Sequence, residues 1–211
     1  MSNSRVAYVI NDAAFFVSHR LPLALKVMEI GGSVCLLTGL NINKEIEDSA
    51  TSILNKKKIP HYKCRFSQGF KNPISELIGL FQLIIILRKY KPTTVHSATA
   101  KANLMSLIAC QFLGRTKLIL SISGMGTLFT GRVRMRKLIL QKLYKLIFKT
   151  LLKGIRFNLI FQNKDDYKNY KSFINFNDSE ANIIEGSGVD IKRLKPLVKK
   201  SNIIKILLPA R

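Results

Sequence analysis

Short apolar runs alternate along this chain with longer segments of helical periodicity. The runs are continuously apolar rather than alternating, which is typical of parallel strands that are buried on both faces. The predicted strands are Arg5–Ile10, Ser33–Thr38, His61–Phe66, Thr93–His96, Lys117–Ile122, Asn158–Gln162 and Ala181–Ile184. The predicted helices are Leu21–Ile30, Ile42–Lys57, Ile74–Tyr90, Ala100–Leu113, Met135–Lys153 and Asp165–Ile174. This pattern predicts an α/β fold, a Rossmann-like doubly wound parallel sheet with helices on both faces.

The end of the chain departs from this pattern. A charged segment precedes one further apolar run, Asn202–Leu208, with three residues after it. A strand without a successor cannot close a new layer. We therefore expect a Rossmann-like domain over residues 1–190, a linker over 191–202, and the first strand of a second domain over 203–211.

Basic residues outnumber acidic ones by 35 to 12, and the formal net charge of +23 with a pI near 10.2 predicts an anionic partner. The excess is local, because residues 77–164 contain sixteen Lys and Arg and no acid. No uncharged run reaches the ~18–20 residues that a membrane-spanning helix needs. The three cysteines lack metal-ligand spacing, and we expect buried thiols in a reducing cytosol: Cys35, Cys64 and Cys110.

Loops after the strands are the places to look for ligand-binding residues, because parallel α/β sheets bind ligands at the carboxyl ends of their strands. His96 ends a predicted strand, Thr99 can cap the next helix, and Lys101 lies in that helix's first turn. These groups and the free helix N–H groups suit an anionic or polyhydroxylated ligand. The alternative is a hydrogen-bonded structural histidine beside a solvated lysine.

Two further loops carry candidates. His19 and Arg20 precede a predicted helix with Ser18 as its N-cap, and Arg20 could bind phosphate, or the segment is only a capped helix start. Residues 121–127 form a small-residue loop whose glycines allow close backbone approach to a ligand, or a plain flexible loop. Its candidates are Ser123, Gly124 and Gly126. We expect His61, on a strand without polar neighbours, to be structural.

Residues 132–156 contain nine cations and no acid. On a helical wheel the cations form one stripe, opposite the apolar residues Leu140, Tyr144, Ile147, Leu151 and Ile155. The members of the stripe are Lys142, Lys145, Lys149, Lys153 and Arg156. An anionic membrane or lipid phosphate is the favoured partner, a solvated face is the second interpretation, and nucleic acid is the third, since no base-reading module is visible.

Five motifs in order resemble bacterial family-four glycosyltransferases, closest to the subgroup that builds lipid-linked O-antigen, capsule or glycan oligosaccharides. They read SHRLPLALKVMEIGGSVCLLTG, VHSATAKANLMSLIACQFLG, SISGMGTLFTG, LIFQNKDD and IIEGSGVDIKRL, and the resemblance spans about residues 5–211. It implies the N-terminal, acceptor-binding half of a GT-B fold. The donor-binding glutamates of the family have no counterpart in this sequence, and Ala98 stands where many relatives carry a second histidine after His96.

The resemblance implies hexosyl or hexosaminyl transfer from a nucleotide-sugar, such as a UDP-sugar, without a metal or other cofactor. The acceptor would be a polyprenyl-diphosphate-linked glycan at the cytoplasmic membrane face, where the protein would be peripheral. It implies His96 as a catalytic candidate and seven acceptor-binding candidates: His19, Arg20, Thr99, Lys101, Ser123, Gly124 and Gly126. Without a donor-binding domain we expect no turnover, and a separate donor-binding chain would then be a partner. Alternatives are a non-catalytic lipid- or glycan-binding fragment, a subunit of a split enzyme and, less favoured, a nucleic-acid-binding protein.

Overall fold

Seven parallel strands form a single sheet in the order β3-β2-β1-β4-β5-β6-β7. The computed structural model describes residues 4–40, 43–67, 72–124, 135–186 and 188. The strands are β1 (Arg5–Ile10), β2 (Ser33–Leu40), β3 (His61–Ser67), β4 (Thr94–Ala98), β5 (Lys117–Ile122), β6 (Phe157–Phe161) and β7 (Ala181–Ile183). The Rossmann-like parallel sheet predicted from the sequence is confirmed. The proposed linker 191–202, the strand 203–211 and Gly126 lie outside the described residues.

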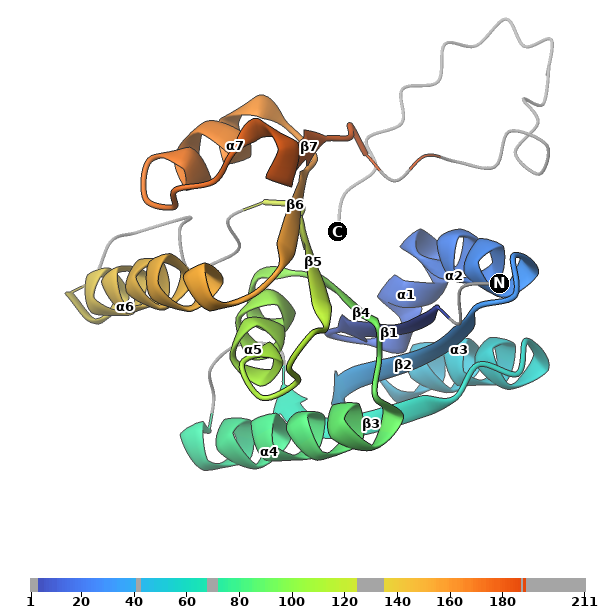
Figure 1. Cartoon of the computed structure of the whole chain (residues 1–211). Helices are drawn as coiled ribbons and strands as arrows, with labels where there is room; N and C mark the ends of the chain where they lie inside the picture. Colours follow the sequence, from blue (N-terminus) through green and yellow to red (C-terminus); the bar gives the residue numbers. More distant parts are fainter. Residues whose placement is uncertain (1–3, 41–42, 68–71, 125–134, 187, 189–211) are drawn as a thin grey trace, which may run out of the picture.

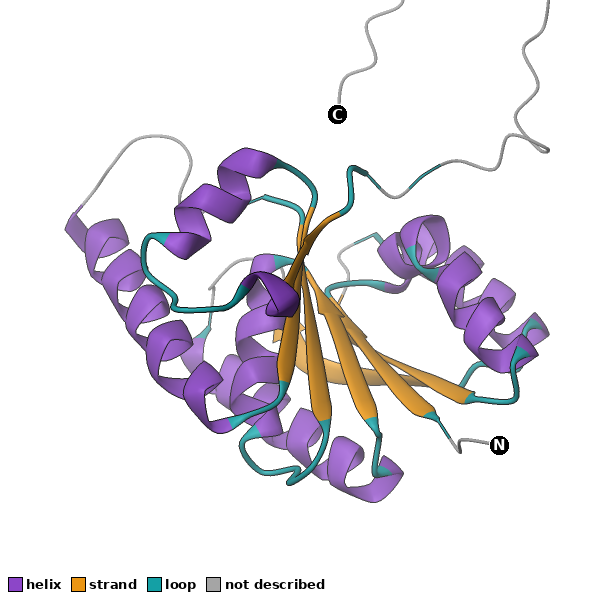
Figure 2. Ribbon diagram, turned by 45° about the horizontal axis from the view of Figure 1, so that its top comes forward, coloured by secondary structure: helices purple, strands orange, loops and turns teal. Residues whose placement is uncertain are grey.

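Helices cover both faces of the sheet (Figures 1 and 2). They are α1 (Ala13–His19), α2 (Leu21–Glu29), α3 (Lys44–Lys56), α4 (Pro73–Tyr90), α5 (Ala100–Cys110), α6 (Met135–Leu151) and α7 (Lys164–Lys171), with short 3-10 turns at Leu152–Gly154 and Asp178–Glu180. The first three helices pack on β1 and β2, and the other four pack on the opposite face.

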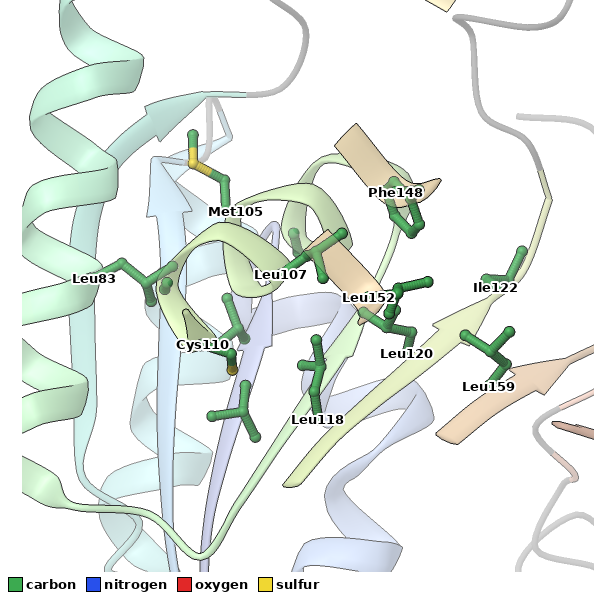
Figure 3. Packing of buried hydrophobic residues seen from close by; sticks show 14 of the residues in the cluster. Leu83, Met105, Leu107, Cys110, Leu118, Leu120, Ile122, Phe148, Leu152 and Leu159 are labelled. Atoms are coloured by element: carbon green, nitrogen blue, oxygen red, sulfur yellow. The ribbon is translucent and has the colours of Figure 1, made fainter. Parts of the chain in front are cut away.

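Each strand near the centre contributes to two cores because its side chains alternate between the faces. Ala7 and Val9 of β1 face the larger core under α4–α7, whereas Tyr8 and Ile10 face the smaller core under α1–α3. Figure 3 shows the larger core, which contains leucines of α4, α5, β5 and β6 together with Phe148 of α6. Each fully buried side chain of this size stabilises the fold by roughly 1.5–3 kcal/mol.

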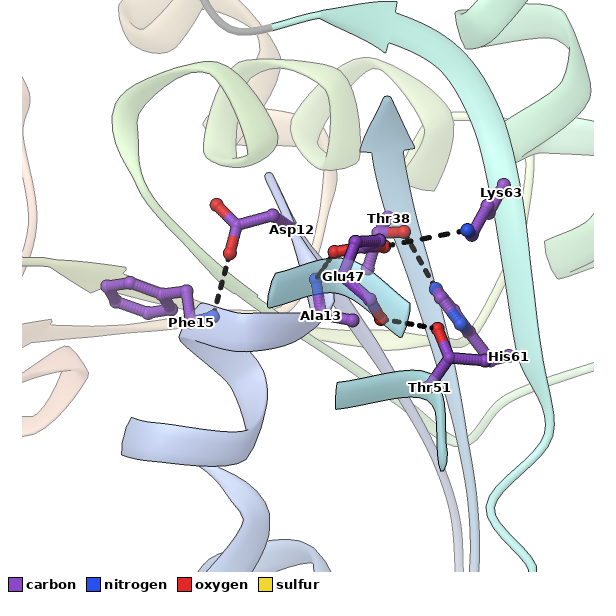
Figure 4. A network of polar contacts seen from close by, with 8 residues as sticks. All are labelled: Asp12, Ala13, Phe15, Thr38, Glu47, Thr51, His61 and Lys63. Atoms are coloured by element: carbon purple, nitrogen blue, oxygen red, sulfur yellow. Dashed lines mark hydrogen bonds and ion pairs between the residues drawn. The ribbon is translucent and has the colours of Figure 1, made fainter. Parts of the chain in front are cut away.

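The first loop contains a helix that the sequence analysis did not predict. Asp12 caps α1, because its Oδ1 accepts a hydrogen bond of 2.7 Å from the Phe15 amide. Glu47 of α3 accepts a second bond, 3.2 Å long, from the Ala13 amide (Figure 4). Ser18 is therefore not an N-cap: it lies in the last turn of α1, where its hydroxyl donates to the Ala14 carbonyl.

The expectation that His61 has no polar neighbour is also wrong. Its Nε2 lies 2.8 Å from Thr38 Oγ1 on the neighbouring strand (Figure 4). Burial, and then the charge of Lys63, lower the pKa of His61 to about 4. The residue is neutral at physiological pH and ties β3 to β2. The three cysteines are buried free thiols, as predicted, and burial raises the pKa of each to about 12: Cys35, Cys64 and Cys110.

Candidate functional site

The strand order reverses between β1 and β4, and this switch point marks the carboxyl edge where doubly wound sheets bind ligands. In the β1–β4 register Val9 is opposite Ser97, so Asn11 and Thr99 follow the two strands side by side. The candidate site comprises the residues at these strand ends and the side chains that reach them from α1, α2 and β5.

His96 does not end its strand as predicted: it is the third residue of β4, two residues before the carboxyl end, and it is buried. Its Nε2 is 2.8 Å from Ser121 Oγ on β5, and its ring centroid is 5.2 Å from that of Tyr8 on β1. Burial, and then the charge of Arg20, lower the pKa of His96 to about 3. The imidazole is therefore neutral at pH 7 and too weak a base for efficient proton abstraction, so hydrogen bonding is the chemistry that it offers.

Arg20 is a buried cation at the joint between α1 and α2. Its guanidinium donates a 3.1 Å bond to the His19 carbonyl. Burial raises the pKa of Tyr8 to about 12, and the nearby charge of Arg20 acts in the opposite direction. Burial lowers the pKa of Arg20 itself. An arginine keeps its proton even so. The fold thus places the positive charge of Arg20 near Tyr8 and His96. The sequence analysis did not predict Tyr8 as a residue of this site.

Further hydrogen bonds hold the ends of β4 and β5 next to His96. Ser97 Oγ donates to Asn103 Oδ1 over 2.7 Å, and Asn103 Nδ2 donates to the Ser121 carbonyl over 3.0 Å. These bonds join β4, α5 and β5, and all three side chains are buried. Because a satisfied buried network is rigid, it fixes the geometry of the site. Nothing in the sequence distinguishes Asn103 from an ordinary helical residue, so this role was missed.

Thr99 and Asn11 carry the clearest mark of a binding site. Thr99 has φ of 82° and ψ of 147°, a region that is essentially restricted to glycine. It occupies the N-cap position of α5, as predicted, but its side chain makes no capping bond. Among the described residues, its Oγ1 and the Oδ1 of Asn11 are buried without a hydrogen-bond partner. Each such atom costs about 1–3 kcal/mol, which a bound ligand or water would recover.

Two predicted site residues have other roles in the structure. Lys101 is not a solvated cation, since it is buried and its Nζ lies 2.7 Å from Glu76 Oε1 on α4. His19 stacks on Phe15 with ring centroids 4.4 Å apart, and its Nδ1 lies 2.6 Å from Ser18 Oγ. The described part of α1 therefore accounts for the orientation of His19 without a ligand.

The loop after β5 is only partly described. Ser123 is exposed and Gly124 has φ of +118°, where a side chain would be strained although no atom would obstruct it. Both residues follow β5 at the same edge as Thr99. Within the described ranges, no three His, Cys, Asp or Glu side chains group as metal ligands, and no helix is long and apolar enough to cross a bilayer.

Comparison with known proteins decides the family. The glycosyl transferase 4-like family matches residues 5–163. The chain belongs to this family. The match includes both strands of the switch point and every described residue of the candidate site.

Solved structures agree on the fold of this glycosyl transferase 4-like chain. MurG of Acinetobacter baumannii superposes with a TM-score of 0.55 at 15% identity, over 92% of this chain and 48% of MurG. CalG4, the calicheamicin glycosyltransferase, gives a TM-score of 0.49 at 12% identity, over 88% of this chain and 53% of that protein. The chain thus spans about half the length of MurG, and its fold is the Rossmann-like half of a GT-B fold. No significant match was found among curated protein sequences.

Proposed function

We propose that this chain is the acceptor-binding domain of a glycosyltransferase that extends a polyprenyl-diphosphate-linked glycan at the cytoplasmic face of the membrane. The observation that carries the proposal is the pair of buried, unpartnered oxygens of Asn11 and Thr99 at the switch point of a glycosyl transferase 4-like domain. They lie where this sheet architecture binds ligands. The transfer reaction belongs to the whole protein, since the chain spans 48% of the length of MurG.

The site's chemistry suits an acceptor with hydroxyl groups and a diphosphate. The oxygens of Asn11 and Thr99 accept hydrogen bonds from sugar hydroxyls, and the neutral imidazole of His96 holds the acceptor in place. Arg20 and the N–H groups at the start of α5 supply the positive potential that attracts phosphate. His96 acts in positioning and hydrogen bonding, because a pKa of about 3 makes it a poor general base.

The donor in this proposal is a nucleotide-sugar, such as a UDP-sugar, bound mainly by a separate donor-binding domain. Departure of the nucleoside diphosphate is assisted by cationic side chains and helix N-termini rather than by a metal ion. A nucleotide-sugar is the only small molecule that the reaction consumes besides the acceptor.

Membrane attachment is supported by the exposed apolar side chains of α4 and α6. Of the nineteen large hydrophobic residues exposed in the described part of the chain, eleven lie on these two helices. On α4 they are Ile74, Leu77, Ile78, Phe81 and Ile85, and on α6 they are Met135, Leu138, Ile139, Leu140, Leu143 and Leu146. Both helices belong to the layer that covers the larger core, with α5 between them (Figures 1 and 2). Such concentrated apolar exposure is typical of an interaction surface.

The predicted lysine stripe is only partly realised in the structure. Lys142, Lys149 and Lys153 are exposed, whereas Lys145 lies 5.2 Å from the centre of the Phe173 ring. Lys153 and Arg156 lie beyond α6, because the helix ends at Leu151: Lys153 is in the 3-10 turn Leu152–Gly154, and Arg156 follows that turn. Leu140, on the predicted apolar face opposite the stripe, is 42% exposed. The outer face of α6 is therefore mixed apolar and basic, the composition of an interfacial helix.

Flotation with vesicles of phosphatidylglycerol and phosphatidylcholine tests the membrane surface. F81Q/I85Q removes two α4 side chains that are each 64% exposed, so the fold should persist. L23Q/I30Q is the matched control, with Leu23 on α2 51% exposed and Ile30, the C-cap residue of α2, 71% exposed. We expect the α4 variant to lose most of its vesicle binding and the control to retain it. Equal binding by both variants would rule out α4 as the membrane surface.

Acceptor binding is tested separately in detergent, with a prenyl-diphosphate-linked N-acetylhexosamine as the probe. T99A and H96Q should each weaken binding at least about tenfold, since each removes a polar contact. H61Q is the matched control, because His61 is an equally neutral histidine that bonds only within the described sheet. If T99A and H96Q bind as tightly as H61Q, the acceptor site is not at the switch point.

A further inference from the structure

A basic cavity lies at the opposite edge of the sheet, where the strands begin. Its volume is about 680 Å³, and it has six cationic side chains and no carboxylate among its lining residues. The cations are Arg5, Arg88, Lys91, Arg115, Lys117 and Arg156. The parallel sheet separates this cavity from the candidate acceptor site, because Arg5 begins β1 whereas Asn11 follows its end.

The floor of the cavity is a row of residues at adjacent strand starts, held in register by backbone hydrogen bonds. The Thr93 amide donates to the Arg5 carbonyl over 2.9 Å, and the Lys117 amide donates to the Thr93 carbonyl over 3.0 Å. The Leu118 amide donates to the Arg156 carbonyl over 2.9 Å. Three cations from β1, β5 and the start of β6 therefore project from a rigid edge.

Further cations approach from the helices. Arg88, in the last turn of α4, donates from Nε to the Phe112 carbonyl over 3.4 Å, and its guanidinium carbon lies 5.9 Å from the centre of the Phe112 ring. Lys91 follows α4 with a left-handed φ of 51°. Both side chains are exposed, and Phe112 is 52% exposed at the cavity wall.

Helix dipoles account for only part of this charge. The carboxyl ends of helices attract cations, which explains Arg88 and Lys91 at the end of α4. Arg5, Lys117 and Arg156 belong to strand starts rather than to the last turn of a helix, and the dipole effect falls off within that turn. Like charges held this close repel one another, and no carboxylate among the lining residues relieves the repulsion. An anion bound among them would relieve it.

Four of the six cations are arginines, whose planar forks bind phosphoryl oxygens in a bidentate manner. We propose that this cavity is a second ligand site, which binds an anion carrying two or more phosphoryl groups. The phosphoryl groups belong either to a soluble oligophosphate or to lipid headgroups at a membrane. In both cases the anion lies across the strand starts of β1, β4, β5 and β6, and Arg88 and Lys91 contact it from the end of α4.

Calorimetric titration of the full chain with inorganic tripolyphosphate at low salt tests the site. R115Q/K117Q should raise the dissociation constant by about tenfold or more, since each lost charged contact is expected to cost that order. K164Q/K168Q removes the same charge from α7, away from the cavity, and should leave binding unchanged. R88Q/R156Q provides an independent pair of substitutions if the first variant does not fold. Identical binding by the folded cavity variant and the α7 control overturns the proposal.

Vesicles distinguish the two sources of phosphate. If the source is soluble, R115Q/K117Q loses tripolyphosphate binding but floats with cardiolipin vesicles as well as the α7 control does. If the source is a lipid headgroup, the same variant also floats less well with cardiolipin vesicles, whose headgroup carries two phosphates. Both results support a phosphoryl site, whereas unchanged tripolyphosphate binding and unchanged flotation refute it.

Discussion

Lys101 of α5 and Glu76 of α4 form an ion pair with an Nζ–Oε1 distance of 2.7 Å, and both side chains are more than nine-tenths buried. The pair joins two helices of the same layer near the carboxyl edge of the sheet. The sequence suggested Lys101 for ligand binding, whereas in the structure its side chain links two helices. Buried pairs of this kind depend on both members, because either charge alone is costly in a nonpolar environment.

Removing the lysine should therefore destabilise the domain strongly. We expect K101M to lower the free energy of unfolding by about 3–5 kcal/mol, because it leaves the Glu76 carboxylate buried beside an apolar side chain. The double variant K101M/E76L should recover most of the loss. Urea unfolding followed by circular dichroism measures both, and a K101M variant as stable as the parent would show that the pair carries no such role.

Glycine at position 99 should make the protein more stable than the native threonine does. Its φ of 82° with ψ of 147° costs roughly 1–3 kcal/mol for a residue with a side chain. Glycine relieves this strain, but its greater freedom in the unfolded chain lowers the stability of the folded state by about 0.4–1 kcal/mol. We expect T99G to raise the free energy of unfolding by about 1 kcal/mol while it weakens acceptor binding. A destabilised T99G would mean that the threonine side chain contributes more to the fold than its strain costs.

Acid should destabilise the protein through His96. Its pKa is about 3 in the folded state against 6.5 for the free side chain, so the unfolded chain binds the proton first as pH falls. The contribution of His96 to the free energy of unfolding is fully present above pH 6.5. It decreases as pH falls towards 3, by about 1.4 kcal/mol per pH unit at most. His61, with a folded pKa of about 4, contributes in the same direction.

Unfolding titrations between pH 7 and pH 5 measure this dependence. H96Q should have a shallower dependence than the parent, and H61Q/H96Q should lose most of the histidine contribution over this range. If the parent and H61Q/H96Q show equal slopes, the two histidines are not held neutral by burial.

Gly79 should not tolerate alanine, although it lies inside α4. A Cβ at this position would be 2.8 Å from backbone atoms of Arg65 and Phe66 on β3. The helix propensity of alanine favours the change by about 1 kcal/mol, but the contact with backbone cannot relax cheaply. We expect G79A to destabilise by about 1–3 kcal/mol in thermal or urea unfolding. G154A is the matched control, since its Cβ would meet only the Gln111 side-chain oxygen at 3.4 Å.

Local sequence patterns were sufficient for most of the elements but not for the first loop. The apolar runs predicted all seven strands, because strands buried on both faces admit few polar residues. The helix α1 was missed although its N-cap, Asp12, is local. Its second amide partner, Glu47, reaches Ala13 from α3, and no local pattern shows that contact. Likewise, the polar partner of His61 lies 23 residues away on β2.

The sequence by itself determined the fold class and the family resemblance, which follow from periodicity and motif order. It also predicted a site at the carboxyl edge, from the direction of parallel strands. Only the tertiary structure decided which polar groups meet. It placed Arg20 near Tyr8 and His96, paired Lys101 with Glu76, and moved Arg156 from the α6 stripe to the opposite edge of the sheet. The physical reason is that charges and hydrogen-bond partners are selected by distance in space, and parallel crossovers bring together residues that lie far apart in the chain.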